Sequence, residues 1–290
     1  MDELSRRALA AALAVGRAQG LRCDQPEVLA DGDNVLVHLA PAPVVARVAT
    51  TTGLVRKPVE RWLKLDLDLA GFLATQNFPV VPPSTEAAPG PYLQDGLALT
   101  LWEFVEHDRN YVAGIDEVGP FLRDLHAVLR GYKGEMRRMS PVTEIPGWLD
   151  EVERWDVVPE EDIAMLRRGY ARISKEIDML SLPEQPIHGD AHRKNVLKTC
   201  RGLVWTDFED ACRGPVAWDL GCFVRTSGED FAKALTEYGG SFDAAELQPF
   251  FDARDLQGAL WGTILSTRFP GRKERAGEWM KICRERYSDS

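Results

Sequence analysis

Three features are missing from this 290-residue sequence, and each absence excludes a class of protein. No apolar run reaches the roughly 18 residues that a membrane-spanning helix requires. The five cysteines form no C-x-x-C pair, and their odd number and wide spacing do not fit a disulfide framework, so we expect a reducing cytoplasm. Lysine and arginine form no basic cluster and the formal net charge is -10, which argues against a nucleic-acid partner.

The remaining composition is that of an ordinary globular protein. Hydrophobic residues make up 44% of the chain and charged residues 28%. A chain of this length buries a full core and forms two lobes or one large domain. The acidic balance favours a cationic small-molecule partner, although many acidic proteins bind no cation. No heptad pattern indicates an oligomeric state.

Hydrophobic spacing divides the chain into a mixed first part and a helical second part. Helical periodicity covers residues 2–19 and 60–75, and β-rich runs cover residues 34–39, 44–49 and 97–104. The proline-rich residues 78–92 predict a loop. From about residue 119 the pattern is mainly helical, including residues 160–180. We therefore predict an N-terminal lobe over 1–104 and a larger C-terminal lobe over 105–290.

The strongest chemical signal lies in the motifs H-G-D-x-H-x-x-N-V-L at residues 188–197 and W-T-D-F-E-D at residues 205–210. Asp190, Asn195 and Asp207 supply two carboxylates and one amide, which are ligands suited to magnesium. In the kinase template, a loop aspartate orients the incoming hydroxyl, while an asparagine and a second aspartate hold the metal ions. The spacing therefore predicts phosphoryl transfer, with Asp190 as the catalytic residue and Asn195 and Asp207 as magnesium ligands.

A hairpin is expected to bring the two metal ligands together. Val196-Leu197 and Leu203 to Trp205 are β-forming runs, and a turn at Arg201-Gly202 separates them. Pairing of these runs would carry Asp207 back beside Asn195.

These motifs, with P-V-A-W-D-L-G at residues 215–221, resemble those of the aminoglycoside phosphotransferase and choline kinase-like family. Weaker matches cover residues 34–49, 62–83, 99–105 and 122–129. The resemblance implies a bilobal protein-kinase-like fold of the α+β class, with an antiparallel sheet in the small N-terminal lobe. It also implies an ATP-dependent kinase that phosphorylates a hydroxyl of a small molecule, such as an aminoglycoside, another antibiotic, choline or a sugar-like metabolite.

Two segments of the N-terminal lobe are candidates for phosphate binding, and no P-loop motif occurs. The turn formed by Gly32, Asp33 and Asn34 could bring backbone N–H groups close to phosphates, or could be only a turn. Arg47 stands on the strand where kinases use a lysine. Because arginine binds phosphate through two parallel hydrogen bonds, the role is chemically retained, although Arg47 could also be an exposed strand residue.

The resemblance assigns the other nucleotide-binding residues. It places Asp66 as the carboxylate that pairs with Arg47, although Asp66 could instead be a solvated helix charge. It also places Glu103 and Val105 at the backbone hinge that binds adenine.

Two other functions are considered for this sequence. The substitutions at Arg47 and Asp66 are compatible with a nucleotide-binding pseudokinase that regulates a partner. His188 and His192, which flank Asp190, could belong to a metal-dependent hydrolase. We expect instead that His188 braces the loop, that His126 is structural and that Asp219 orients the loop.

Overall fold

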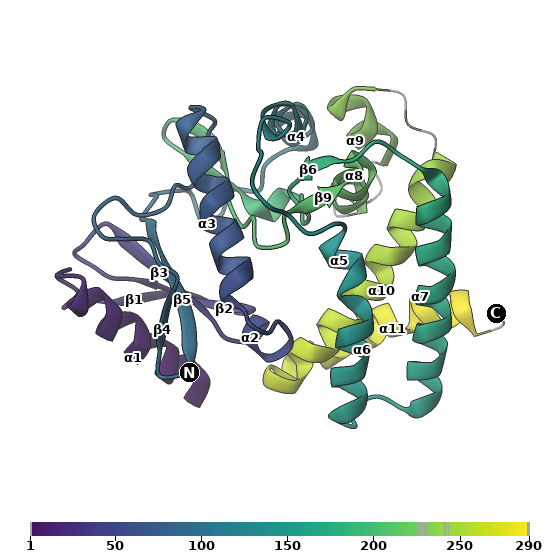
Figure 1. The fold of residues 1–290 in the computed structure, drawn as a ribbon, viewed down its shortest axis with the longest axis horizontal. Helices are drawn as coiled ribbons and strands as arrows, with labels where there is room; N and C mark the ends of the chain where they lie inside the picture. The colour runs from purple at the N-terminus through teal and green to yellow at the C-terminus, as the bar shows by residue number, and fades with distance from the viewer. Residues whose placement is uncertain (1, 226–227, 229–230, 241, 243, 289–290) are drawn as a thin grey trace. The chain divides into compact units, whose positions relative to one another are not determined.

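The computed structural model describes residues 2–225, 228, 231–240, 242 and 244–288. The chain forms two compact units, which consist of Met1–Val112 with Asn195–Glu209 and of Ala113–Lys194 with Asp210–Ser290 (Figure 1). The sequence predicted a single boundary near residue 104. The difference arises because a hairpin from the second half of the chain joins the first unit, where Val81 N–H donates to the Trp205 carbonyl at 2.9 Å and Trp205 N–H donates to the Pro79 carbonyl at 3.0 Å.

The first unit is built on a five-stranded antiparallel sheet in the order β1-β2-β3-β5-β4. Its strands are β1 Glu27–Asp31, β2 Asn34–His38, β3 Val44–Ala49, β4 Tyr92–Gln94 and β5 Leu97–Glu103. The unit also holds the helices α1 Glu3–Ala18, α2 Thr52–Val55 and α3 Glu60–Thr75, and the hairpin strands β7 Val196–Thr199 and β8 Gly202–Trp205. The expected antiparallel sheet of the N-terminal lobe is therefore confirmed.

Helices α1 and α3 lie on opposite faces of this sheet (Figure 1). Successive strand residues point to opposite faces, and Val44, Ala46 and Val48 of β3 join the α1 residues in one buried cluster. Ala49, at the end of β3, packs instead with Leu63 of α3 in a second cluster. Arg47 shares the face of Ala49, so the alternation of β3 directs its side chain toward α3.

Helix α1 begins and ends where its sequence predicts. Asp2 caps the first turn by accepting a hydrogen bond from Ser5 N–H at 2.7 Å, and Gly20 follows the helix with a φ of 79°, a conformation that favours glycine. The predicted helix over residues 60–75 coincides with α3. The sequence analysis missed β1, α2 and β4, which are short elements of five, four and three residues.

The second unit is mainly helical, as predicted. Its elements are α4 Ile115–Leu129, α5 Ser140–Thr143, α6 Ile145–Arg154, α7 Glu160–Leu180, β6 Gln185–Ile187, β9 Cys212–Gly214, α8 Val216–Arg225, α9 Phe231–Tyr238, α10 Ala244–Arg268, η2 Pro270–Arg272 and α11 Lys273–Tyr287, and the short helix η1 Arg193–Asn195 leads into β7. Strands β6 and β9 pair antiparallel and flank the loop that carries Asp190. Among the described helices, none combines the length and apolar character that crossing a membrane requires.

Candidate active site

The loop that carries Asp190 is held in place by its backbone. Asp219 of α8 is fully buried and accepts hydrogen bonds from His188 N–H and Gly189 N–H, each at 2.8 Å. Gly189 has a φ of 85°, and a Cβ atom at this position would lie 1.8 Å from the Asp210 carbonyl oxygen. Only glycine fits there. The predicted role of Asp219 in orienting the loop is confirmed.

Two histidines support the same loop from within the second unit. His188 is buried, and its Nδ1 accepts a hydrogen bond from Asp190 N–H at 3.3 Å. His126 of α4 places Nε2 2.8 Å from Asp219 Oδ2 and Nδ1 2.9 Å from the Tyr238 hydroxyl. The expected structural roles of His188 and His126 are thus confirmed.

Asp190 itself lies between two nitrogen donors of the second unit. Arg254 of α10 donates from Nη2 to Asp190 Oδ1, and His192 Nε2 lies 3.2 Å from Asp190 Oδ2. Burial opposes ionisation of Asp190, but the charges of Arg254 and His192 outweigh it and hold the pKa of this carboxyl well below its usual range. Asp190 is therefore an ionised carboxylate, suited to orienting a hydroxyl.

The two predicted metal ligands lie in the first unit, at the open end of the β7–β8 hairpin. Val196 pairs with Trp205, and Thr206 N–H donates to the Asn195 carbonyl at 3.0 Å, so the residues that precede β7 and follow β8 are neighbours. Asp207 then adopts a φ of 70°, which is uncommon outside glycine. The hairpin brings Asn195 and Asp207 to the same end of the two strands, as the sequence predicted, whereas Asp190 belongs to the second unit.

Arg47 binds three carboxylates inside the first unit. Its Nη1 lies 3.0 Å from Asp66 Oδ2, and its Nη2 contacts both Asp207 Oδ1, at 2.6 Å, and Glu209 Oε2. Burial lowers the pKa of Arg47, but these carboxylates outweigh it and raise the pKa above its ordinary value. Asp66 also accepts a hydrogen bond from Phe208 N–H at 3.0 Å, which ties α3 to the segment after β8. Arg47 and Asp66 thus form the predicted type of cation–carboxylate pair.

Glu209 organises the interior of this cluster. Its side chain is only 4% exposed, accepts from Asn34 Nδ2 at 2.9 Å and pairs with Arg56 Nη1 at 2.9 Å as well as with Arg47. Burial raises the pKa of Glu209, but the charges of Arg47 and Arg56 outweigh it, and the net pKa is lowered. From its place after Asp207 in the sequence, Glu209 could reach the metal or a cationic substrate or could lie exposed on the surface; the structure buries it. No sequence motif singles out Arg56.

The turn at residues 31–34 is a compact structure. Gly32 N–H donates to the Asn34 carbonyl at 3.1 Å, and the Asp33 carbonyl accepts from Thr52 N–H at 3.2 Å. Because the Gly32 N–H is used within the turn and Asn34 binds Glu209, these groups fix the turn beside Arg47.

Glu103 and Val105, the residues predicted at the adenine-binding hinge, differ in how their backbone N–H groups are used. Glu103 N–H donates to the Pro82 carbonyl at 3.1 Å, so β5 uses this donor internally. Val105 N–H makes no hydrogen bond with the residues that the structure describes. The Val105 N–H group is therefore available as a hydrogen-bond donor.

The oxygen donors of the first unit fit a magnesium ion bound with nucleotide phosphates. Asp207 is 39% exposed, and its Oδ2 makes no hydrogen bond or ion pair with the described residues. In this part of the chain, no group of three or more His, Cys, Asp or Glu side chains is placed to hold a metal. Magnesium nevertheless needs only one or two protein ligands when phosphates and waters supply the others. Asn195 and Asp207 meet that requirement.

The residue that the sequence analysis missed most clearly is Arg254. It lies 64 positions after Asp190, within a 25-residue helix that contains several other charged residues. Helical periodicity could have assigned it to a buried face, but no motif marks its contact with Asp190.

The comparisons with known proteins identify the family of this chain. Residues 22–250 match the model of the phosphotransferase enzyme family, and the chain therefore belongs to that family. The sequence matches no curated protein.

Several solved structures share the fold. An amicoumacin kinase aligns with a TM-score of 0.72 and 14% identity over 99% of this chain and 96% of its own. A choline kinase from Streptococcus pneumoniae gives 0.64 and 14% over 94% and 99%, and an aminoglycoside phosphotransferase from Streptomyces rimosus gives 0.62 and 18% over 86% and 98%. The predicted α+β protein-kinase-like fold and the family are confirmed.

Proposed function

We propose that this phosphotransferase is an ATP-dependent, magnesium-requiring kinase that transfers the γ-phosphoryl group to a hydroxyl of a small molecule. The observation that carries the proposal is the position of Arg47, which contacts both Asp66 of α3 and Asp207 after β8. The three residues matched to the phosphate-binding cation, its carboxylate partner and the metal-binding aspartate of the kinase template therefore lie in contact within one unit, which supports these roles.

The structural neighbours support the nucleotide part of this proposal. The amicoumacin kinase was solved with AMP-PNP and Ca2+, and the Streptomyces rimosus enzyme with ADP and streptomycin. In this chain Arg47 would bind phosphate oxygens, Val105 N–H would bind the adenine edge, and Asn195 with Asp207 would hold magnesium. When bound, the metal neutralises negative charge on the phosphates.

Asp190 would act on the acceptor. As an ionised carboxylate it would accept a hydrogen bond from the acceptor hydroxyl and orient its oxygen toward the γ-phosphorus. A bond forms between that oxygen and phosphorus, and the bond from phosphorus to the β,γ-bridging oxygen breaks. ADP leaves with the electron pair, and the hydroxyl proton passes by way of Asp190 to solvent.

Two observations favour this enzyme over the other functions considered. Arg47 and Asp66 form a buried pair at 3.0 Å, so the substitutions that suggested a pseudokinase retain the ion pair. His188 hydrogen-bonds the Asp190 backbone from a buried position, which suits a brace better than a hydrolase metal ligand.

Slow ATP hydrolysis in the absence of any acceptor tests the proposal. We expect magnesium-dependent ADP release from the wild type, loss of that release in Asp190→Ala with AMP-PNP binding retained, and loss of the magnesium dependence of binding in Asp207→Asn. Asp68→Asn is the matched control, because Asp68 is an exposed aspartate that pairs with Lys64 on α3. AMP-PNP binding that ignores magnesium, with no ADP release under any condition, would favour the pseudokinase. Zinc retained through purification, with ester cleavage in the absence of ATP, would favour the hydrolase.

A further inference from the structure

Arg254 places a positive charge in direct contact with the candidate catalytic carboxylate. It projects from α10, donates from Nη2 to Asp190 Oδ1, and donates from Nη1 to Gln257 Oε1 at 2.5 Å. Both contacts lie within the second unit. Neither the family motifs nor the structural neighbours' names assign this residue a role.

The guanidinium of Arg254 has N–H groups that its contacts in the structure do not use. A guanidinium carries five N–H donors, and the structure assigns two contacts to Arg254, so its remaining N–H groups make no hydrogen bond with the described residues. The side chain is 19% exposed, equal to that of Asp190. A molecule that brings a hydroxyl to Asp190 therefore meets these N–H donors next to it.

We propose that Arg254 is a specificity-determining residue, which selects acceptors whose reacting hydroxyl lies beside a carboxylate or similar anionic oxygen group. The proposal rests on the function proposed above, because it requires Asp190 to receive the acceptor hydroxyl. The anionic group binds the unused N–H donors of Arg254, and charge-assisted hydrogen bonds from arginine to carboxylate are among the strongest and most directional in proteins. An ammonium group in the same place meets the like charge of the Arg254 guanidinium, which disfavours its binding there.

The positive charge of Arg254 favours an anionic acceptor, whereas the net charge of the whole sequence favoured a cationic one. A formal net charge of -10 favoured a cationic acceptor. However, charges on the protein surface are screened within about 8 Å at physiological ionic strength, whereas Arg254 touches the carboxylate at which the hydroxyl would react. Contact charges therefore decide the class of acceptor, and net charge affects mainly the rate of encounter.

Acceptors that share a skeleton and differ in charge provide the test. One set is glucuronate, glucose and glucosamine, and a second is glycerate, glycerol and 3-aminopropane-1,2-diol. ADP release above the acceptor-free rate gives kcat/KM for each compound. We expect the anionic member of at least one set to exceed the amine by about tenfold or more, a size typical of one charge-assisted contact.

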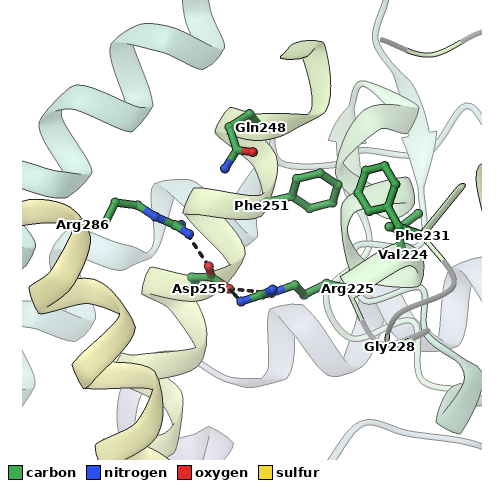
Figure 2. A pocket seen from close by; sticks show the side chains of 8 residues that line it. All are labelled: Val224, Arg225, Gly228, Phe231, Gln248, Phe251, Asp255 and Arg286. Atoms are coloured by element: carbon green, nitrogen blue, oxygen red, sulfur yellow. Dashed lines mark hydrogen bonds and ion pairs between the residues drawn. The ribbon is translucent and has the colours of Figure 1, made fainter. Parts of the chain in front are cut away.

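Three variants distinguish a role of Arg254 in acceptor selection from a general loss of structure. Arg254→Gln should bring the anion and the amine to within about threefold, mainly by raising KM for the anion, while Arg254→Lys should keep the anion preferred. Arg225→Gln is the matched control. Arg225 Nη2 lies 2.8 Å from Asp255 Oδ1, and Asp255 is the residue next to Arg254 on α10. Figure 2 shows this pair, so the variant also removes an arginine–aspartate pair to α10 without touching Asp190. It should leave the ranking unchanged.

Three results would overturn the inference: a preference for the amine, an order that Arg254→Gln leaves unchanged, or no turnover of either anion. If magnesium-dependent ATP hydrolysis still requires Asp190 in that case, only the acceptor class is wrong. If this hydrolysis is absent as well, the proposed function fails with it.

Discussion

At the scale of single residues, ion pairs determine which side chains of the candidate site are charged. Asp190 is partly buried and Glu209 is buried, yet each has a lowered pKa because arginines lie against it. Asp66 is the contrasting case. Burial raises the pKa of Asp66 to about 7, because desolvation and the nearby Asp207 and Glu209 outweigh the attraction of Arg47. The balance between burial and the neighbouring charges therefore differs from one carboxylate to the next.

Removing Arg254 should change the pH dependence of activity. In the wild type the lowered pKa keeps Asp190 ionised as pH falls, so protonation of Asp190 limits activity only below the ordinary aspartate range. In Arg254→Gln, burial acts with less opposition and the pKa of Asp190 rises, which should bring the acidic limb of ATP hydrolysis above about pH 4, where the wild type shows none. Rate profiles between about pH 4 and 8 measure this. Superimposable profiles for the two proteins would contradict the assigned role of Arg254.

Glu209 should contribute strongly to stability. Glu209→Gln preserves the shape of the side chain but leaves the buried guanidiniums of Arg47 and Arg56 with one carboxylate fewer, and breaking a buried pair in this way costs about 3–5 kcal/mol. Urea unfolding followed by circular dichroism measures the loss. Asp68→Asn removes an exposed pair and should change the free energy of unfolding by less than about 1 kcal/mol. Equal losses of unfolding free energy in the two variants would show that the buried ion pairs of Glu209 stabilise the fold no more than an exposed pair does.

At the scale of elements, local signals determined how much could be predicted. Helix α3 and strand β3 were predicted at their observed bounds because their periodicity is strong and their neighbours include clear breaks. The β7–β8 hairpin was also predicted, since its turn and β-forming runs are adjacent in sequence. Strand β1 is as long as β2 but contains a single β-branched residue, and α2 and β4 hold only four and three residues, too few for a repeated pattern to identify them.

Contacts between distant segments could not be read in the same way. Asn195 and Asp207 were recognisable because one hairpin joins them. Arg254 lies 64 positions from its partner Asp190, and Arg56 lies 153 positions from its partner Glu209. The sequence around an arginine does not indicate which distant carboxylate it will bind. The sequence therefore revealed the residues of the motif and missed the cations that set their charge.

The turn at Gly189 should be intolerant of any side chain. In Gly189→Ala the new Cβ would collide with the Asp210 carbonyl, and alanine disfavours a φ of 85°. We expect a loss of stability of about 2 kcal/mol or more and loss of ATP hydrolysis, measured by thermal unfolding and ADP release. Gly277→Ala on α11 is the control, because no atom lies within 4 Å of its Cβ position and alanine favours a helix. A Gly189→Ala protein as stable and active as the control would show that the loop is not fixed at this residue.

At the scale of the whole molecule, the chain distributes the proposed machinery over two units, and one segment from its second half belongs to the first unit. The first unit carries Arg47 and the hairpin ligands, and the second carries Asp190 with the helices that orient and charge it. The segment Asn195–Glu209 leaves the second unit, contributes Asn195 and Asp207 to the first and returns. Sequence order and spatial grouping therefore differ most where the motif residues lie.

Transfer of label from ATP tests the central claim most directly. The protein is incubated with magnesium, ATP labelled at the γ-phosphorus and a mixture of small hydroxyl compounds, and the labelled products are separated. We predict that the wild type moves the label onto an organic hydroxyl as a phosphate ester, with one ADP formed for each ester, and that Asp190→Ala forms none. Label that remains on ATP, or that appears only as inorganic phosphate with every compound, would contradict the account.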